Sequence, residues 1–116
     1  ELVSQVYTIE IVTPLAKKAE KLLQKLAYEN ITVKAGDGFD GWEEQAPFDA
    51  IILTCAVKKI PQPLIRQLQE GGRIILPRGG RFAVQNLIIG IKQGGRLKTK
   101  HIIPVRFVPM TGKAEK

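Results

Sequence analysis

The sequence predicts an α/β layered domain in which a mostly parallel sheet carries an antiparallel hairpin at one side. Its first two-thirds alternate apolar, β-branched runs with two candidate helices, the order that gives parallel strands. Two longer strand-like runs follow, joined by a Gly-Gly turn that is typical of an antiparallel hairpin. A length of 116 residues fits one domain of modest size.

The first half of the chain predicts a helix between two strands. Val3–Ile9 has the apolar and β-branched composition of a buried strand. Thr13-Pro14 supplies a helix N-cap and a first helical residue, and Ile31–Val33 forms a second strand before the turn-rich Gly36-Asp37-Gly38. The helix carries lysines on one side and an apolar stripe on the other, formed by Leu15, Ala19, Leu22, Leu23 and Leu26.

The middle of the chain predicts a strand, a short helix and another strand. Ala50–Thr54 shows no polar alternation, so we expect both of its faces to be covered. Pro63–Leu68 can form a short helix that Gly71-Gly72 terminates. Arg73–Leu76 then forms the fourth strand.

The last third predicts the hairpin and a tail. Ala83–Ile91 and Leu97–Val108 are the two strands, joined by Gln93-Gly94-Gly95. Beyond them, only Lys113–Lys116 is expected to be loose.

The composition is that of a globular protein, with 44% apolar and 25% charged residues, but the charge is unevenly distributed. Residues 1–57 have a net charge of −4 and residues 58–116 a net charge of +11. The single cysteine, Cys55, excludes an internal disulfide, and no residue cluster has the spacing of metal ligands. No apolar run approaches the ~20 residues of a membrane helix, and no signal segment opens the chain. We therefore expect a cytoplasmic protein.

Gly36–Gly41 matches the pattern G-x-G-x-x-G, but we reject a dinucleotide-binding fingerprint. The loop opens no helix that could hold a pyrophosphate, and its two carboxylates would repel one. An acidic glycine loop can instead accept hydrogen bonds from a ligand, although the spacing alone favours an ordinary tight turn. Glu10 ends the first strand, so Glu10 and Asp37 together indicate a nucleoside site at the carboxyl ends of two strands.

Three other features have ordinary structural explanations. Cys55 follows a buried strand, which favours a core or pocket residue over a nucleophile. His101 is the single histidine and is expected to be structural or exposed. The basic second half could bind nucleic acid or an acidic peptide, but Phe82 and Phe107 are its only aromatic residues, so stacking on bases is poorly supported.

A series of short motifs extends in order along nearly the whole chain: Val6-Tyr7-Thr8-Ile9-Glu10, Gly36-Asp37-Gly38 with Gly41-Trp42, Ala46-Pro47-Phe48-Asp49-Ala50-Ile51, Ile60-Pro61 with Leu64-Ile65 and Gln67-Leu68, Gly71-Gly72-Arg73 with Pro77, and Val105-Arg106-Phe107-Val108-Pro109-Met110-Thr111. With its matching gaps, this series resembles the protein-L-isoaspartate O-methyltransferase family. The resemblance implies a Rossmann-like class I methyltransferase that uses S-adenosylmethionine. Such an enzyme esterifies the α-carboxyl group of L-isoaspartyl residues in damaged proteins, and the ester then collapses to a succinimide that can reopen as normal aspartate.

The resemblance also implies which residues would bind the cofactor. Glu10 would hold its ribose, and Asp37 and Gly38 would lie at the adenine. Cys55 and Ala56 occupy positions where the family has small residues beside the cofactor.

For the isoaspartyl peptide, the resemblance points to the Val-Pro-x-Thr stretch. Val108, Pro109 and Thr111 would help to hold the peptide, partly through backbone contacts. A sulfonium methyl group is already activated, so placing the carboxylate in line with it would supply most of the catalysis without a metal.

The sequence departs from the family pattern in several places. Ile11 replaces a common arginine, and Val57-Lys58-Lys59 replaces a common Ala-Pro-acidic run at the substrate entrance. The family's glycine-rich cofactor loop and the segment with its active-site Ser or Thr and its substrate-binding His do not occur in this sequence. We therefore expect no catalytic residue within residues 1–116 and interpret them as a single, N-terminally incomplete domain.

The central first strand of the family's sheet also falls outside this sequence. It would lie between the strand at Val6 and the strand at Ala50, and without it both would leave backbone groups unpaired. We therefore expect the isolated chain to be unstable, or to pair with the missing N-terminal segment or with another chain.

Two alternatives belong to other functional classes. The chain could be a non-catalytic interaction module that retains the methyltransferase fold, or a protein that binds or methylates nucleic acid, as its basic half suggests. Against the latter, Thr54-Cys55-Ala56-Val57 lacks the Asn/Asp-Pro-Pro-aromatic motif with which amino-group methyltransferases grip a base.

Overall fold

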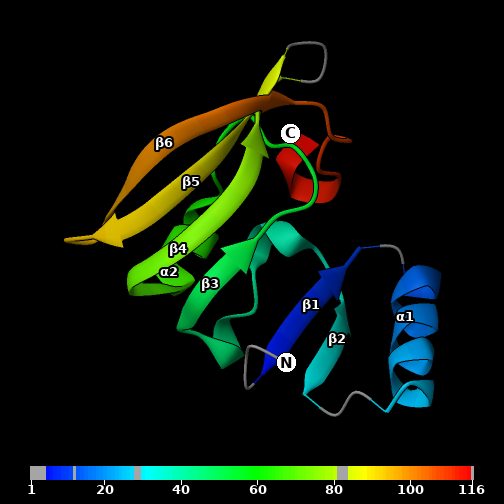
Figure 1. The fold of residues 1–116 in the computed structure, drawn as a ribbon. Coiled ribbons are helices and arrows are strands. Elements are labelled where there is room, and N and C mark those ends of the chain that lie inside the picture. Colours follow the sequence, from blue (N-terminus) through cyan, green and yellow to red (C-terminus); the bar gives the residue numbers. More distant parts are fainter. Residues whose placement is uncertain (1–4, 12, 28–29, 81–83, 116) are drawn as a thin grey trace. The chain divides into compact units, whose positions relative to one another are not determined.

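The computed structural model describes residues 5–11, 13–27, 30–80 and 84–115. They form two compact units, residues 1–38 (the N-terminal unit) and residues 39–116 (the C-terminal unit), and each is described by itself (Figure 1). The beginnings of the predicted strands Val3–Ile9 and Ala83–Ile91 lie outside the described residues.

The N-terminal unit contains the predicted strand, helix and strand. These are β1 (Val6–Glu10), α1 (Thr13–Lys25) and β2 (Ile31–Ala35). The two strands pair in parallel, in register from the first residue of each strand to the last. The β-branched residues of both strands favour extended backbone, and the helix begins at the predicted Thr13-Pro14.

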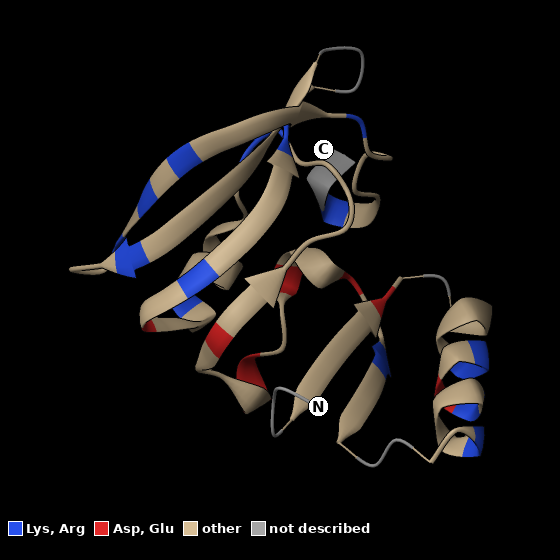
Figure 2. Cartoon of the chain, in the orientation of Figure 1, with Lys and Arg blue, Asp and Glu red and all other residues tan. Residues whose placement is uncertain are grey.

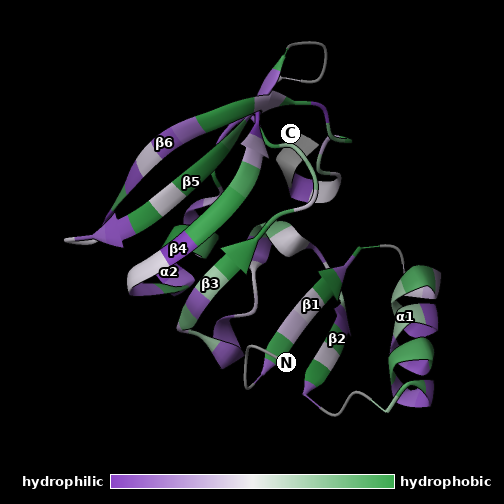
Figure 3. Ribbon diagram, viewed as in Figure 1, coloured by the Kyte–Doolittle hydropathy of each residue, from purple (hydrophilic) through white to green (hydrophobic). Residues whose placement is uncertain are grey.

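The apolar stripe of α1 is wider than the surface that covers it. Ala16 is buried and Ala19 and Leu23 are half-buried, but Leu15, Leu22 and Leu26 are 52%, 55% and 58% exposed. Figure 3 shows hydrophobic and hydrophilic residues interleaved along α1. A sheet of two strands covers only a narrow strip of a helix, so the predicted stripe is covered only in part.

The C-terminal unit is built on a four-stranded mixed sheet in the order β3-β4-β5-β6. Its strands are β3 (Phe48–Ile52), β4 (Leu68–Arg78), β5 (Gln85–Gln93) and β6 (Arg96–Val105), and the short helix α2 (Gln62–Gln67) precedes β4. β3 and β4 pair in parallel, whereas β4–β5 and β5–β6 are antiparallel. The predicted hairpin is therefore confirmed, and the parallel pairs are β1–β2 and β3–β4.

The turn of the hairpin is held by a carboxylate from outside it. Gly94 and Gly95 adopt φ values of 61° and 74°, which glycine tolerates and a two-residue hairpin turn requires. The Glu70 carboxylate in β4 accepts hydrogen bonds from both of their backbone N–H groups. Lys92 of β5 donates to the carbonyl of Leu68 at 2.8 Å, which ties the same end of the hairpin to β4.

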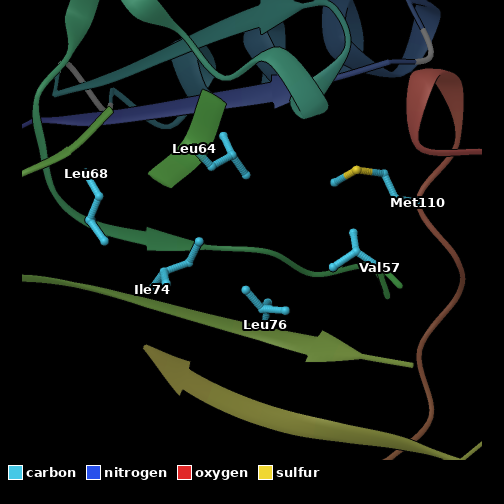
Figure 4. Packing of buried hydrophobic residues seen from close by; sticks show 6 residues of the cluster. All are labelled: Val57, Leu64, Leu68, Ile74, Leu76 and Met110. Atoms are coloured by element: carbon cyan, nitrogen blue, oxygen red, sulfur yellow. The ribbon is translucent and has the colours of Figure 1, made fainter. Parts of the chain in front are cut away.

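The apolar core of the C-terminal unit lies where β4 meets α2 and the C-terminal segment. Leu68, Ile74 and Leu76 are at most 1% exposed. Figure 4 shows them with the other buried members of the cluster, Val57, Leu64 and Met110. Ile74 and Leu76 alternate along β4, so one face of the sheet forms this core.

One face of β3 is not covered within the described structure. Ala50 is exposed and Ile52 is 71% exposed, so the prediction that both faces of this strand are covered is wrong. Among the described residues, β3 pairs with β4 alone and forms an edge of its sheet. An apolar run records a preference for burial, but it does not guarantee that a neighbour is present.

The glycine pair after α2 does not end that helix. α2 ends at Gln67 and the chain enters β4 directly, so Gly71-Gly72 lies inside the strand. Gly71 has a φ of 82°, and the register with β3 shifts between Phe48 and Ala50, as at a β-bulge. A Cβ on Gly72 would lie 3.0 Å from the carbonyl oxygen of Asp49, so glycine permits the close approach of β3.

The C-terminal tail is structured where it is described. Gly112–Glu115 forms a 3-10 turn, η3, and Lys113 Nζ lies 2.6 Å from Asp40 Oδ2. The prediction of a loose tail is therefore wrong for Lys113, and Lys116 lies outside the described residues. Within the described ranges, no helix combines the length and the hydropathy needed to cross a membrane.

A buried glutamine fixes the turn that precedes β3. Gln67 is 5% exposed, and its Oε1 accepts a hydrogen bond from the backbone N–H of Trp42 at 2.8 Å. Its Nε2 donates to the carbonyl of Asp40 at 2.8 Å. Between these residues Gly41 has a φ of 65°, and a Cβ there would collide with Gln67 Oε1 and approach Leu64 Cδ2 to 2.9 Å.

We predict that Gly41→Ala lowers the free energy of unfolding by about 1–3 kcal/mol, because it combines backbone strain with displacement of the buried Gln67 amide. Gly38→Ala is the matched control, since a Cβ at Gly38 meets no atom within 4 Å. Urea denaturation of both variants measures the difference. Equal losses of stability in the two variants would contradict this explanation.

Candidate functional site

Glu10 and the loop Gly36–Gly38 lie together in the N-terminal unit. Glu10 is the last residue of β1 and is in register with Ala35, the last residue of β2. The backbone N–H of Gly36 donates to the carbonyl of Glu10 at 2.9 Å, so the loop begins beside Glu10. In open α/β sheets, ligands bind beyond the carboxyl ends of parallel strands, which is where these residues lie.

The acidic side chains give this edge its chemistry. Figure 2 shows acidic residues at the end of β1 and after β2. Glu10 and Asp37 are half-buried, and Glu10 Oε2 accepts a hydrogen bond from the backbone N–H of Ile11 at 3.1 Å. Carboxylates accept several hydrogen bonds, so this edge can bind the hydroxyl and amino groups of a nucleoside. The loop continues into a 3-10 turn, η1 (Gly38–Asp40), and not into an α-helix, which agrees with rejecting the dinucleotide fingerprint.

In the C-terminal unit, Ala56 is paired with the C-terminal segment. The N–H of Ala56 donates to the carbonyl of Val108 at 2.7 Å, and the N–H of Met110 donates to the carbonyl of Ala56 at 2.8 Å. These two bonds form a parallel bridge between Ala56 and Pro109. Residues nearly half the chain apart in sequence are thereby brought into contact.

The next residue, Val57, is paired on its other side, in a parallel bridge with Arg78. The N–H of Val57 donates to the carbonyl of Pro77 at 3.1 Å, and the N–H of Gly79 donates to the carbonyl of Val57 at 2.9 Å. Ala56 and Val57 are each 3% exposed. Residues 56–57 therefore lie as a short middle strand between the end of β4 and residues 108–110.

Within the C-terminal unit, the structure thus brings Ala56, which the resemblance places beside the cofactor, into contact with Val108 and Pro109, which it places beside the peptide. Cys55 is half-buried and packs against the core, as predicted, and Ala56 is fully buried. Val108 is 73% exposed, Pro109 is exposed, and Thr111 is exposed between Met110 and η3. The backbone of this segment is fixed while its side chains face solvent. His101, on β6, is exposed.

One polar residue that sequence reasoning missed holds this segment from the other side. Gln85 begins β5 and is 2% exposed. Its Nε2 donates to the carbonyl of Phe107 at 3.0 Å, and the N–H of Phe107 donates to its Oε1 at 2.6 Å. The sequence offers only a weak signal, a glutamine at the start of an apolar run, and nothing local distinguishes it from an exposed residue.

Other features of the described residues offer little as binding sites. A depression of about 210 Å³ lies between the end of α1 and the start of β2, at the opposite end of β2 from the Gly36–Gly38 loop. In the described parts of the chain, no three His, Cys, Asp or Glu side chains gather as metal ligands would.

Comparison with known proteins agrees with these observations. The family profile described as protein-L-isoaspartate(D-aspartate) O-methyltransferase matches residues 1–115. A protein-L-isoaspartate O-methyltransferase 2 from Polaromonas sp. is 52% identical over 97% of this chain and 54% of its own length. Another from Syntrophobacter fumaroxidans is 50% identical over 97% of this chain and 46% of its own length. The chain therefore spans about half the length of these curated relatives.

Solved structures give the same result for the fold. A protein-L-isoaspartate O-methyltransferase structure superimposes with a TM-score of 0.90 at 28% identity, covering 95% of this chain and 35% of that one. A Plasmodium falciparum protein assigned to the same enzyme, in complex with S-adenosyl-L-homocysteine, gives a TM-score of 0.78 at 22% identity and covers 92% of this chain and 52% of that one. The fold is that of the class I methyltransferases, and this chain belongs to the protein-L-isoaspartate O-methyltransferase family.

Proposed function

We propose that the protein methylates the α-carboxyl group of L-isoaspartyl residues in damaged proteins, with S-adenosylmethionine as methyl donor, and that residues 1–116 supply part of this enzyme. Family membership supports the proposal. The observation that carries it is the position of Glu10 beside the Gly36–Gly38 loop at the carboxyl ends of β1 and β2. The cytoplasm is the proposed location, and the free thiol of Cys55 is compatible with a reducing compartment.

The residues of this chain fit the nucleoside end of the cofactor. The Glu10 carboxylate would accept hydrogen bonds from the ribose hydroxyls, and Asp37 with Gly38 would lie against the adenine. Cys55 and Ala56, with their small side chains, would leave room for the cofactor in the C-terminal unit. When bound, S-adenosylmethionine supplies a methyl group that is already activated on a sulfonium, so the protein's part is to bind and orient.

The exposed segment Val108–Thr111 fits an extended peptide. Its backbone is fixed by Ala56, so Val108, Pro109 and Thr111 would present a preorganised surface to the isoaspartyl residue. The charge of the second half supports a carboxylate-rich substrate. Figure 2 shows Lys and Arg along β4, β5 and β6, and register places Arg73 and Lys98 on either side of Ile91.

We also propose that a further strand, from the segment absent from this sequence or from another chain, completes the sheets. Within the described residues, β1 pairs with β2 alone and β3 with β4 alone. The exposed apolar side chain of Ile52 shows in addition that one face of β3 is uncovered within the described residues, as expected for an incomplete domain. Unpaired strand edges favour pairing with another strand. We therefore propose that residues 1–116 are one domain that is incomplete until such a strand is added.

The first prediction from this proposal concerns the stability of the isolated chain. In urea, the isolated chain should unfold in a broad transition whose m-value is below that expected for one cooperative domain of 116 residues. Circular dichroism, with and without the segment that completes the sheets, measures it. A single cooperative transition of full-domain size in the isolated chain would contradict the proposed incompleteness.

The second prediction concerns the cofactor. Glu10→Ala and Asp37→Ala should each weaken S-adenosylmethionine binding by about 10- to 100-fold, the effect of losing a hydrogen bond to a charged group. Isothermal titration calorimetry on the form of the protein that binds the cofactor measures this. Glu20→Ala on α1 and Asp49→Ala on β3 are matched carboxylate controls, expected to bind like the unsubstituted protein. Unchanged affinity in both test variants would refute the assignment.

The third prediction concerns the reaction. In the cofactor-binding form, labelled methyl groups should pass to a peptide containing L-isoaspartate and not to the same peptide with normal aspartate. The two peptides have the same composition and charge, so the comparison isolates the geometry of the carboxylate. Equal labelling of both, or of neither, would contradict the proposed substrate. Salt-dependent binding of DNA or RNA in place of peptide methylation would favour the nucleic-acid alternative.

A further inference from the structure

The segment Arg106–Met110, which we call the strap, is fixed on one side by Ala56. Met110 is 7% exposed and donates to the Ala56 carbonyl, while Val108 accepts from the Ala56 N–H. Both bonds lie at residues 108–110. Neither bond holds the beginning of the strap, where the chain leaves β6 after Val105.

Gln85 holds that beginning. The β5–β6 ladder ends at the pair Gln85↔Val105, and the side chain of Gln85 then pairs with Phe107, two residues farther on. A carboxamide has an acceptor oxygen and an NH2 donor side by side, so it can take the place of the backbone C=O and N–H of a neighbouring strand. The backbone of the strap is thus held at Phe107 and again at residues 108–110, while the side chain of Val108 remains exposed.

The surroundings of Gln85 leave it little freedom. Its side chain is buried, and a Cβ on Gly79 would lie 2.8 Å from its Cα. Removing the amide would leave the N–H and carbonyl of Phe107 without these partners in a part-buried position. A carboxylate at the same place would retain the acceptor for the N–H but would face the carbonyl of Phe107 with no donor.

We propose that Gln85 is a positioning residue for the peptide substrate: it holds the strap where Val108 and Pro109 meet the isoaspartyl residue. This inference rests on the proposed function. The side chain of Gln85 hydrogen-bonds to Phe107 of the strap and would act through it. Loss of Gln85 is therefore expected to weaken peptide binding and to leave cofactor binding nearly unchanged.

Gln67 provides a matched control, because it has the same kind of structural role elsewhere. Both glutamines are at most 5% exposed, and each makes one donated and one accepted hydrogen bond to backbone. Both belong to the C-terminal unit, but Gln67 holds Asp40 and Trp42 and not the strap. A general loss of stability would affect both variants, whereas a positioning role is specific to Gln85.

The experiment compares Gln85→Leu with Gln67→Leu in the cofactor-binding form of the protein. Fluorescence anisotropy with a labelled isoaspartyl peptide gives the peptide Kd, and calorimetry gives the S-adenosylmethionine Kd. We expect Gln85→Leu to raise the peptide Kd about 10-fold or more, with a cofactor Kd within about twofold of the unsubstituted value. Gln67→Leu should leave the peptide Kd within about twofold.

Gln85→Glu and Gly79→Ala extend the test if Gln85→Leu does not fold. Gln85→Glu conserves shape and the acceptor while removing the donor, and Gly79→Ala displaces Gln85 without changing it. Both should raise the peptide Kd in the same direction.

Each other outcome is distinguishable. If the peptide Kd is unchanged in Gln85→Leu, Gln85→Glu and Gly79→Ala, the inference is overturned and the proposed function is left intact. Equal losses in the Gln85 and Gln67 variants would also overturn it. If the unsubstituted protein binds cofactor but no isoaspartyl peptide, the proposed function fails and the inference fails with it.

Discussion

The double pairing of Ala56 and Val57 is the interaction on which one end of the C-terminal unit depends. Ala56 bonds to Val108 and Met110, and Val57 bonds to Pro77 and Gly79. Buried backbone groups need partners, and these two residues, each 3% exposed, obtain them only while the segments on both sides remain in place. Val57 and Met110 also belong to the apolar core. The residues whose backbone bonds hold residues 108–110 in place are therefore also residues whose packing stabilises the unit.

The elements that could be predicted are those that a local feature decides. The β-branched run at Ile31–Val33 and the Gly94-Gly95 turn each favour one backbone conformation strongly. Gly71-Gly72 was different, because a glycine with positive φ serves equally well in a helix end or in a bulge. The close approach of Asp49 from β3 decides between them, and that contact depends on tertiary structure. The exposed Ile52 likewise depends on what lies beside β3, which its own sequence does not encode.

The candidate site shows the same division. Glu10 and Asp37 could be paired from sequence because the carboxyl ends of parallel strands share an edge. The pairing of Ala56 with Val108 and Met110 was not predicted, since no periodicity connects residues so far apart. Gln67 and Gln85 could not be predicted, because glutamine is usually exposed and its burial here depends on backbone groups supplied by distant segments.

The contact between Glu70 and the hairpin turn has a consequence for the alignment of the strands. The turn alone fixes the register of β6 against β5. Glu70 also fixes the turn against β4, so the register of all three strands is set together. A slip of the hairpin by one residue would turn Ile88, 1% exposed, outward and bring Ile89 inward. The strap begins directly after β6, so the same slip would carry it past Ala56. A carboxylate at one end of the hairpin therefore determines which residues the other end presents.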